Sequence, residues 1–285
     1  MTEFTSKNPA RLVWRLMPLG VMLAVAWMLA CCLAMIFFPL LSDLSVTDIN
    51  LTARLDPPVG FGGDWSHPLG TDDLGRDVLA RLISSIRTSL LIALGAVAIS
   101  GTIGTLIGIT AAHMGGWVDQ LIVGAVDAQV SVPFIIISLT LTAIFGNSIV
   151  LFIVVLGLFG WERYTRLARA MTMAARGRGY VLAMSTLGFS WRRIYLRHVL
   201  PNIASTLLVT MTISFPEVIL LETSLSFLGL GIQPPMTSLG NMLGFGRAYL
   251  FTGWWIAAAP GLTIFLCALS VSVIGDWARS MISRL

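Results

Sequence analysis

The stretch TSLLIALGAVAISGTIGTLIGITAAHMGGWV, residues 88–118, decides the fold. It runs for 31 residues between Arg87 and Asp119 without an Asp, Glu, Lys or Arg. An α-helix needs about 20 apolar residues to cross the hydrocarbon core of a bilayer. A lone segment in lipid must also satisfy its own backbone hydrogen bonds, which a helix does. The stretch therefore predicts a membrane-spanning helix.

Other charge-free stretches repeat this pattern along the chain. The longest, of 34 residues, is interrupted by the turn pair Gly146–Asn147 and predicts two spans, near 121–145 and 148–166. The first charge-free stretch of the chain, residues 16–42, is longer than the 7–15 residues of a signal-peptide core, so we expect it to remain in the protein as a membrane span. No ten-residue alternation typical of a membrane β-barrel is present. The sequence predicts an all-α, polytopic membrane protein with six transmembrane helices, the other spans lying within residues 16–42, 88–118, 198–216 and 248–275.

Composition points the same way. Hydrophobic residues make up 56% of the chain, charged residues only 11%, and mean hydropathy is +0.86. Soluble domains carry about 25% charged residues. This excludes a conventional soluble enzyme, a disordered protein and, despite the net charge of +4, a free nucleic-acid binder.

The distribution of arginine predicts the orientation, because cytoplasmic loops hold the excess of Arg and Lys. Residues 162–197 contain eight Arg and one acid, Glu162, so we expect them in the cytoplasm. Residues 42–87 contain seven Asp and four Arg and should form an outer loop. Six spans then place both termini in the cytoplasm, with a cytoplasmic segment over 1–15 and one membrane domain over 16–285.

Residues for catalysis or metal binding are not apparent. His67, His113 and His198 fall in three separate regions without ligand spacing, and no phosphate-binding loop is present. The glycine-rich run from Gly101 to Gly108 is apolar, which favours close helix packing over nucleotide binding. We therefore expect no catalytic residue, no metal ligand and no cofactor bound by this chain.

The most informative inner segment is WERYTRLARAMTMAARGRGYVLAMSTLGFSWRRIYLRHVLPNIAS, residues 161–205. Helix formers occupy 163–175 and 180–187, a turn follows at Gly188, and a further helical stretch should stop before Pro201. Two short, arginine-rich helices joined at a glycine would form a hook at the membrane surface. From charge alone, such a hook also suits anchoring to lipid headgroups.

Acidic residues inside the spans are further candidates, because carboxylates within a membrane are costly and usually paired or functional. Asp127 falls in the third predicted span, and Glu217 and Glu222 in the fifth. Five residues amount to roughly 500° around a helix, so the two glutamates should not share a face. One would face a solute pathway and the other a neighbouring helix, or an Arg of a partner subunit.

The outer loop carries the run HPLGTDDLGRD, residues 67–77. Asp favours helix N-caps and first turns. Asp72 and Asp73 before Gly75, with Arg76 and Asp77 following, therefore predict the capped start of a helix, stabilised by local ion pairs. That helix would run through Leu79, Leu82 and Ile83. Substrate contact and docking of a binding protein remain alternatives for this loop.

Four segments resemble a known family. Ala183, Gly188 five residues later and then Leu200–Pro201 resemble the EAA loop of bacterial ABC importer permeases. The chain departs from that pattern at Leu182, where Glu is usual, at Met184 and at His198. The run 67–77, the segment ETSLSFLGLG at 222–231 and the end of the last span, 268–276, resemble the C-type permease of dipeptide, oligopeptide and nickel importers. The resemblance covers nearly the whole chain.

This resemblance implies the type I ABC importer permease fold, in the inner membrane. It implies half of a translocation pathway for short peptides, with nickel chelates, glutathione or opines as alternative solutes. The implied partners are a homologous B-type permease, two ATPase subunits that bind the ATP, and an external solute-binding protein. The loop 161–201 would couple to the ATPases through Ala183, Gly188, Arg192, Arg193, His198, Leu200 and Pro201, and the outer-loop signature would comprise His67, Gly70, Asp72, Asp73, Gly75, Arg76 and Asp77.

Two other classes remain to be weighed. An intramembrane enzyme would need a catalytic pair within the spans, and none is evident. A self-contained proton-coupled carrier is disfavoured because the chain has neither an internal repeat nor a titratable relay.

Overall fold

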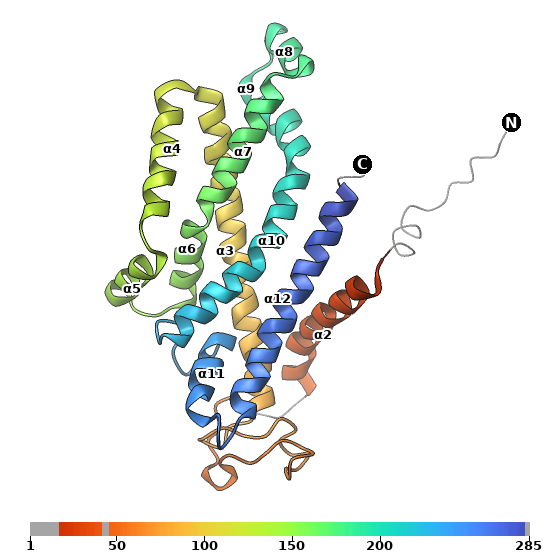
Figure 1. Ribbon diagram of the computed structural model, residues 1–285, viewed down its shortest axis with the longest axis vertical. Helices are drawn as coiled ribbons and strands as arrows, with labels where there is room; N and C mark the ends of the chain where they lie inside the picture. The colour runs from red at the N-terminus through yellow and green to blue at the C-terminus, as the bar shows by residue number, and fades with distance from the viewer. Residues whose placement is uncertain (1–16, 42–45, 283–285) are drawn as a thin grey trace, which may run out of the picture.

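The computed structural model describes residues 17–41 and 46–282, which fold into a bundle of long helices (Figure 1). The predicted N-terminal segment 1–15 and the first residues of the predicted outer loop, 42–45, lie outside this range. The elements are α2 (Leu19–Leu41), η1 (Leu51–Ala53), α3 (Val78–Met114), α4 (Gly116–Ser131), α5 (Phe134–Phe145), α6 (Ile149–Phe159), α7 (Trp161–Arg176), α8 (Gly179–Thr186), α9 (Trp191–Ile194), η2 (Tyr195–Val199), α10 (Leu200–Phe227), α11 (Leu239–Gly246), η3 (Arg247–Tyr249) and α12 (Trp255–Ile282).

Helix α3 is the centre of the bundle, and α7, α6, α10, α11 and α2 pack around it. Its contact with α7 depends on the glycines of the predicted packing run. A Cβ at Gly104 would come within 2.4 Å of the Trp161 carbonyl oxygen, and one at Gly108 within 2.5 Å of the Thr165 carbonyl oxygen. The run is therefore a helix-packing surface, as predicted.

Four of the described helical segments are long and apolar enough to cross a membrane, namely 19–38, 78–114, 191–227 and 255–281. The predicted third span is instead broken, because α4 and α5 meet at an angle of 85°. Pro133 explains the break. The residue before a proline is pushed out of the helical region, and Val132 has φ −98° and ψ 125°. Helix α6 has only 11 residues and continues after Gly160 into α7, so six spans do not appear as six single helices.

Three predicted boundaries were wrong. The loop predicted over 42–87 ends at Asp77, because Asp77 caps α3 and residues 78–87 are helical. Residues 161–176 of the predicted inner loop form α7 and pack along α3 rather than protruding. The helical stretch before Pro201 does not stop, since residues 191–227 form one continuous helical segment.

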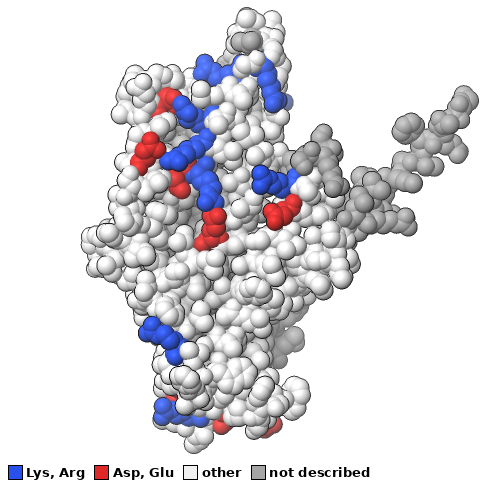
Figure 2. All heavy atoms as spheres, in the orientation of Figure 1, with Lys and Arg blue, Asp and Glu red and all other residues white. Residues whose placement is uncertain are grey.

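The long helices give the molecule two ends (Figure 1). At one end, here called the loop end, residues 46–77 lie with α11 and η3. At the other, the hook end, α8 and α9 protrude beyond α7 and α10. Figure 2 shows a band of uncharged surface between the middle of the molecule and the loop end. The long helices also carry many exposed leucines, among them Leu94, Leu106 and Leu262. Such apolar surface is typical of contact with lipid or with other membrane helices.

Candidate functional site

The hook comprises residues 177–194, that is α8, α9 and the turn between them. Helix α8 ends at Thr186, and Gly188 has φ +77°. The Gly188 N–H donates to the Ser185 carbonyl at 3.1 Å and the Phe189 N–H to the Met184 carbonyl at 3.2 Å. This pair of bonds is a Schellman motif, which favours glycine because its φ is positive. The predicted glycine turn is confirmed.

The tip of the hook is exposed, while its base is packed. Leu187 is 75% exposed, and Ala183, Gly188, Arg192 and Arg193 are also on the surface. The guanidinium of Arg192 lies over the Trp191 ring at 5.6 Å, and that of Arg193 over the Phe189 ring at 4.8 Å. At the base, a small apolar core holds the hook to the bundle; its buried residues include Val181, Ile194, Tyr164, Tyr195 and Ile203.

The remaining predicted hook residues lie in the helix that follows. The Leu200 N–H bonds to the Tyr195 carbonyl, five residues back, which makes residues 195–199 a single π-helical turn. Pro201 has no N–H to give, and the widened turn lets the helix pass it without ending. His198 and Leu200 are half-buried here, and Pro201 is exposed. These residues therefore form the root of the hook rather than its tip.

Two of the predicted membrane carboxylates are paired within the chain. Arg166 Nη2 lies 3.0 Å from Asp127 Oδ1, and Arg163 Nη1 lies 2.6 Å from Glu217 Oε2. The sequence analysis missed a third pair, Arg169 with Asp119, at 2.5 Å. The signal was present, because arginines at intervals of three residues share one face of a helix. All three arginines belong to α7.

Glu222 has a different environment. Its side chain is fully buried. Ser226 Oγ donates to Glu222 Oε1 at 2.7 Å and Ser89 Oγ to Oε2 at 3.2 Å. Ser89 Oγ also accepts the Leu239 N–H at 3.1 Å. The carboxylate therefore joins α10 to α3 and α11 within this chain, which fits the prediction that one glutamate faces neighbouring helices.

The outer-loop signature forms a buried ion-pair network. Asp72 accepts from the Leu74 and Arg76 N–H groups at 2.9 and 3.0 Å and from Arg76 Nε at 2.7 Å. It also pairs with the guanidinium of Arg81, a buried residue that the predicted signature did not include. Asp77 Oδ1 caps α3 by accepting the Ala80 N–H at 2.7 Å, and its Oδ2 lies 2.9 Å from His67 Nδ1. The predicted cap with local ion pairs is confirmed.

Two aromatic residues far along the chain complete this network. Trp255 Nε1 donates to the Thr71 carbonyl at 3.0 Å. Tyr249 Oη donates to Asp73 Oδ2 at 3.0 Å, and this bond to a carboxylate raises the pKa of the Tyr249 phenol. Gly70 is required because it has φ +75° and a Cβ there would lie 2.5 Å from the Asp56 carbonyl oxygen. The loop end is thus bonded to α3, η3 and α12 of the same chain.

Among residues 17–41 and 46–282, no three His, Cys, Asp or Glu side chains are grouped to hold a metal ion. The structure has a polar network at the loop end, ion pairs along α7 in the middle and the exposed hook at the other end.

Comparison with known proteins is consistent with that arrangement. Residues 104–284 match the family described as binding-protein-dependent transport system inner membrane component. The chain is 35% identical over 280 residues to the probable D,D-dipeptide transport system permease protein of Escherichia coli (strain K12), covering 98% of this chain and 92% of that one. It is 35% identical to the di/tripeptide transport system permease protein of Pseudomonas aeruginosa (strain UCBPP-PA14), over 91% and 86% of the two chains. It is 34% identical to the oligopeptide transport system permease protein of Mycobacterium tuberculosis (strain CDC 1551 / Oshkosh), over 98% and 95%.

Proposed function

Since the chain belongs to the family of binding-protein-dependent transport system inner membrane components, we propose that it is one permease subunit of an ABC importer for short peptides. It is a multi-pass protein of the inner membrane. The observation that carries the peptide assignment is the similarity over almost the whole chain to permeases named for dipeptides, di- and tripeptides and oligopeptides. Nickel chelates, glutathione and opines remain the alternative solutes.

The hook is the proposed contact with the ATPase subunits. It protrudes from the bundle, its tip is exposed, and its base is fixed by a separate apolar core. Because its base is fixed in this way, the hook can transmit a rigid-body displacement to α7 and α10. When the ATPases close on ATP, their movement would pull the hook and change the access of the pathway from one side of the membrane to the other. ATP would bind only to those partner subunits, so this chain would have no ATPase site of its own.

The orientation follows from the arginines. With the hook end in the cytoplasm, the five arginines of 176–197 lie on the cytoplasmic side and the Asp-rich loop end faces outward. The broken pair α4–α5 and the successive helices α6–α7 would be the third and fourth crossings, which places both termini in the cytoplasm. Cysteines introduced at Ser66 and Ser190 should then label from opposite sides of the membrane with an impermeant reagent. Labelling of both from one side would refute this topology.

The proposed assembly also contains a homologous B-type permease, two ATPase copies and an external binding protein. The closed polar network of the loop end would give that binding protein a preformed surface rather than contact the solute. The test is purification followed by reconstitution. The chain alone should neither hydrolyse ATP nor move a tripeptide, whereas the complex with its partners should do both. ATP turnover by the isolated chain, or a complex that transports nickel chelates but no peptide, would contradict the proposal.

A further inference from the structure

The three ion pairs of α7 form a continuous charged strip. Arg163 pairs with Glu217 of α10, and Arg166 and Arg169 pair with Asp127 and Asp119 of α4. Figure 2 shows red and blue side chains intermixed over this face of the molecule. The side chains of the first two pairs are 46–64% exposed, so the strip is open to whatever lies beside it.

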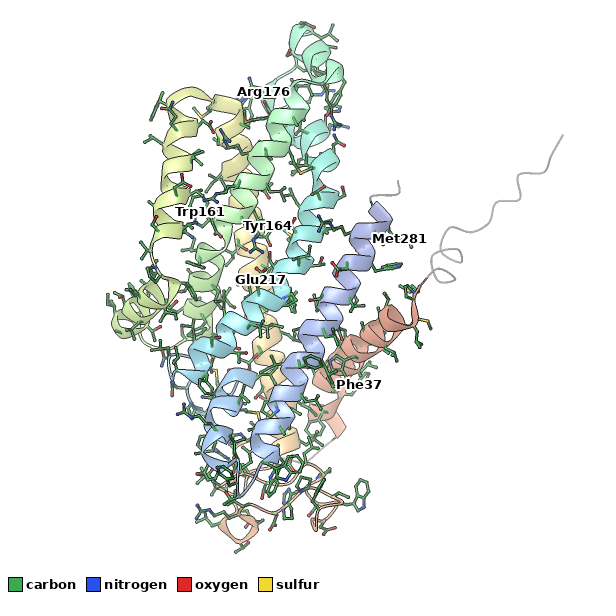
Figure 3. All side chains as sticks on the ribbon, in the orientation of Figure 1. Phe37, Trp161, Tyr164, Arg176, Glu217 and Met281 are labelled. Atoms are coloured by element: carbon green, nitrogen blue, oxygen red, sulfur yellow. The ribbon has the colours of Figure 1, made fainter. Side chains whose placement is uncertain are left out.

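The strip begins deep in the membrane. Glu217 precedes the end of α10 at Phe227 by ten residues, which is about 15 Å of helix. That is about half of the ~30 Å hydrocarbon core. Figure 3 labels Glu217 about halfway along the molecule and Arg176 nearer the hook end. From Arg163 the strip follows α7 from the middle of the bundle towards the hook.

Lipid is excluded as the neighbour of these groups. Charged side chains at mid-membrane face a bundle interior or a water-filled cavity, because their transfer to hydrocarbon is costly. A half-exposed ion pair at this depth therefore needs either water or another polypeptide beside it.

The strip also has a distinctive charge pattern. It presents three guanidinium groups and three carboxylates, so it is neutral overall but offers both signs within each pair. Exposed ion pairs contribute only about 0–1 kcal/mol. They can therefore open when a solute supplies an ammonium group for the carboxylate and a carboxylate for the guanidinium.

We propose that this strip lines the hook-side half of the solute pathway and selects solutes that carry both a free ammonium and a free carboxylate group. The inference rests on the proposed permease function and deepens it by naming the surface and the charge class of the solute. Unblocked short peptides carry both groups at their termini. A singly charged solute would leave one member of an opened pair without a partner, and a neutral solute would leave both members without one.

The first test measures water access in the assembled importer. In Arg166→Cys, the thiol should react with a water-soluble thiosulfonate added from the hook side. Leu262 of α12 is 60% exposed and serves as the control. In Leu262→Cys, the reaction of the thiol should be at least about tenfold slower. Excess tripeptide with free termini should protect the first site, and the same peptide acetylated and amidated should not. An unreactive Arg166→Cys, as expected if the partner permease covers the strip, would overturn the proposal.

The second test measures selection. The double variant Arg166→Gln/Asp127→Asn keeps hydrogen-bonding groups but removes both charges. Transport of the free tripeptide should show a KM raised about fivefold or more, while the amount of bound ATPase stays unchanged. An unchanged KM would overturn the selective role. Absence of peptide transport by the unmodified complex would instead contradict the permease function itself, so the two failures are distinguishable.

Discussion

At the loop end the charged side chains of residues 67–81 are bonded to one another inside the chain, whereas at the hook end the cationic and apolar side chains of residues 183–193 lie on the surface. Asp72 receives backbone and guanidinium donors and is almost fully buried. Leu187, by contrast, is 75% exposed. The buried ion pairs of the loop end stabilise the fold, whereas the exposed hook offers a surface to a partner. Changes at the two ends should therefore have different consequences.

The largest effect is expected from Asp72→Ala. The change leaves the buried guanidinium of Arg81 without its carboxylate, and breaking a buried ion pair costs about 3–5 kcal/mol. We expect a large loss of folded protein, measured as thermal stability in detergent. Asp64→Ala, in an exposed part of the same loop, is the control and should change little. Equal stability of both variants would show that the loop-end network is not structural.

The next effect tests the hook with two variants that carry similar backbone strain, so that a difference between them reflects the position of the residue. Gly188 and Gly60 both have positive φ, +77° and +92°, and neither has an atom within 4 Å of a Cβ. Replacing either by Arg costs about 1–2 kcal/mol of backbone strain. Gly188→Arg should abolish ATPase association or transport, while Gly60→Arg should leave both intact. Normal transport by Gly188→Arg would remove the coupling role.

The sequence predicted the four long apolar helices and the glycine turn because both depend on local pattern. It did not predict the break at Pro133, because a charge-free run indicates that a segment is hydrophobic but not whether its helix axis stays straight. The pairing of Arg169 with Asp119, fifty residues away, and the bond from Tyr249 to Asp73 depend on how helices pack. The sequence did predict that Glu217 and Glu222 would face different sides, because helical periodicity alone determines it.

A smaller effect should separate protein coupling from lipid anchoring. The guanidinium groups of Arg192 and Arg193 lie over aromatic rings at the surface, and exposed cation–π contacts contribute about 0.5–1 kcal/mol each. Changing both to Ala should leave membrane insertion unchanged and lower the free energy of unfolding by about 1–2 kcal/mol in all. A graded loss of membrane association as Arg192, Arg193 and Arg197 are removed would favour the lipid anchor.

The smallest expected effect concerns Tyr249→Phe. Its hydrogen bond to Asp73 should contribute about 1 kcal/mol. Because the bond raises the pKa of the folded phenol, its contribution is complete below the unfolded value of about 10. It is lost as the pH rises through the higher folded value. The stability difference between the two proteins should therefore be constant at neutral pH and disappear in alkali, which a series of thermal melts would measure.

The contrast between the two ends is tested most directly by photo-crosslinking in the assembled, transporting complex. Leu187 at the hook and Trp65 in the loop are both apolar and highly exposed, at 75% and 79%. With a photoreactive amino acid at either position, the account predicts an adduct with an ATPase subunit from position 187 and none from position 65. An active complex that gives no ATPase adduct from position 187, or gives one from position 65, would contradict it.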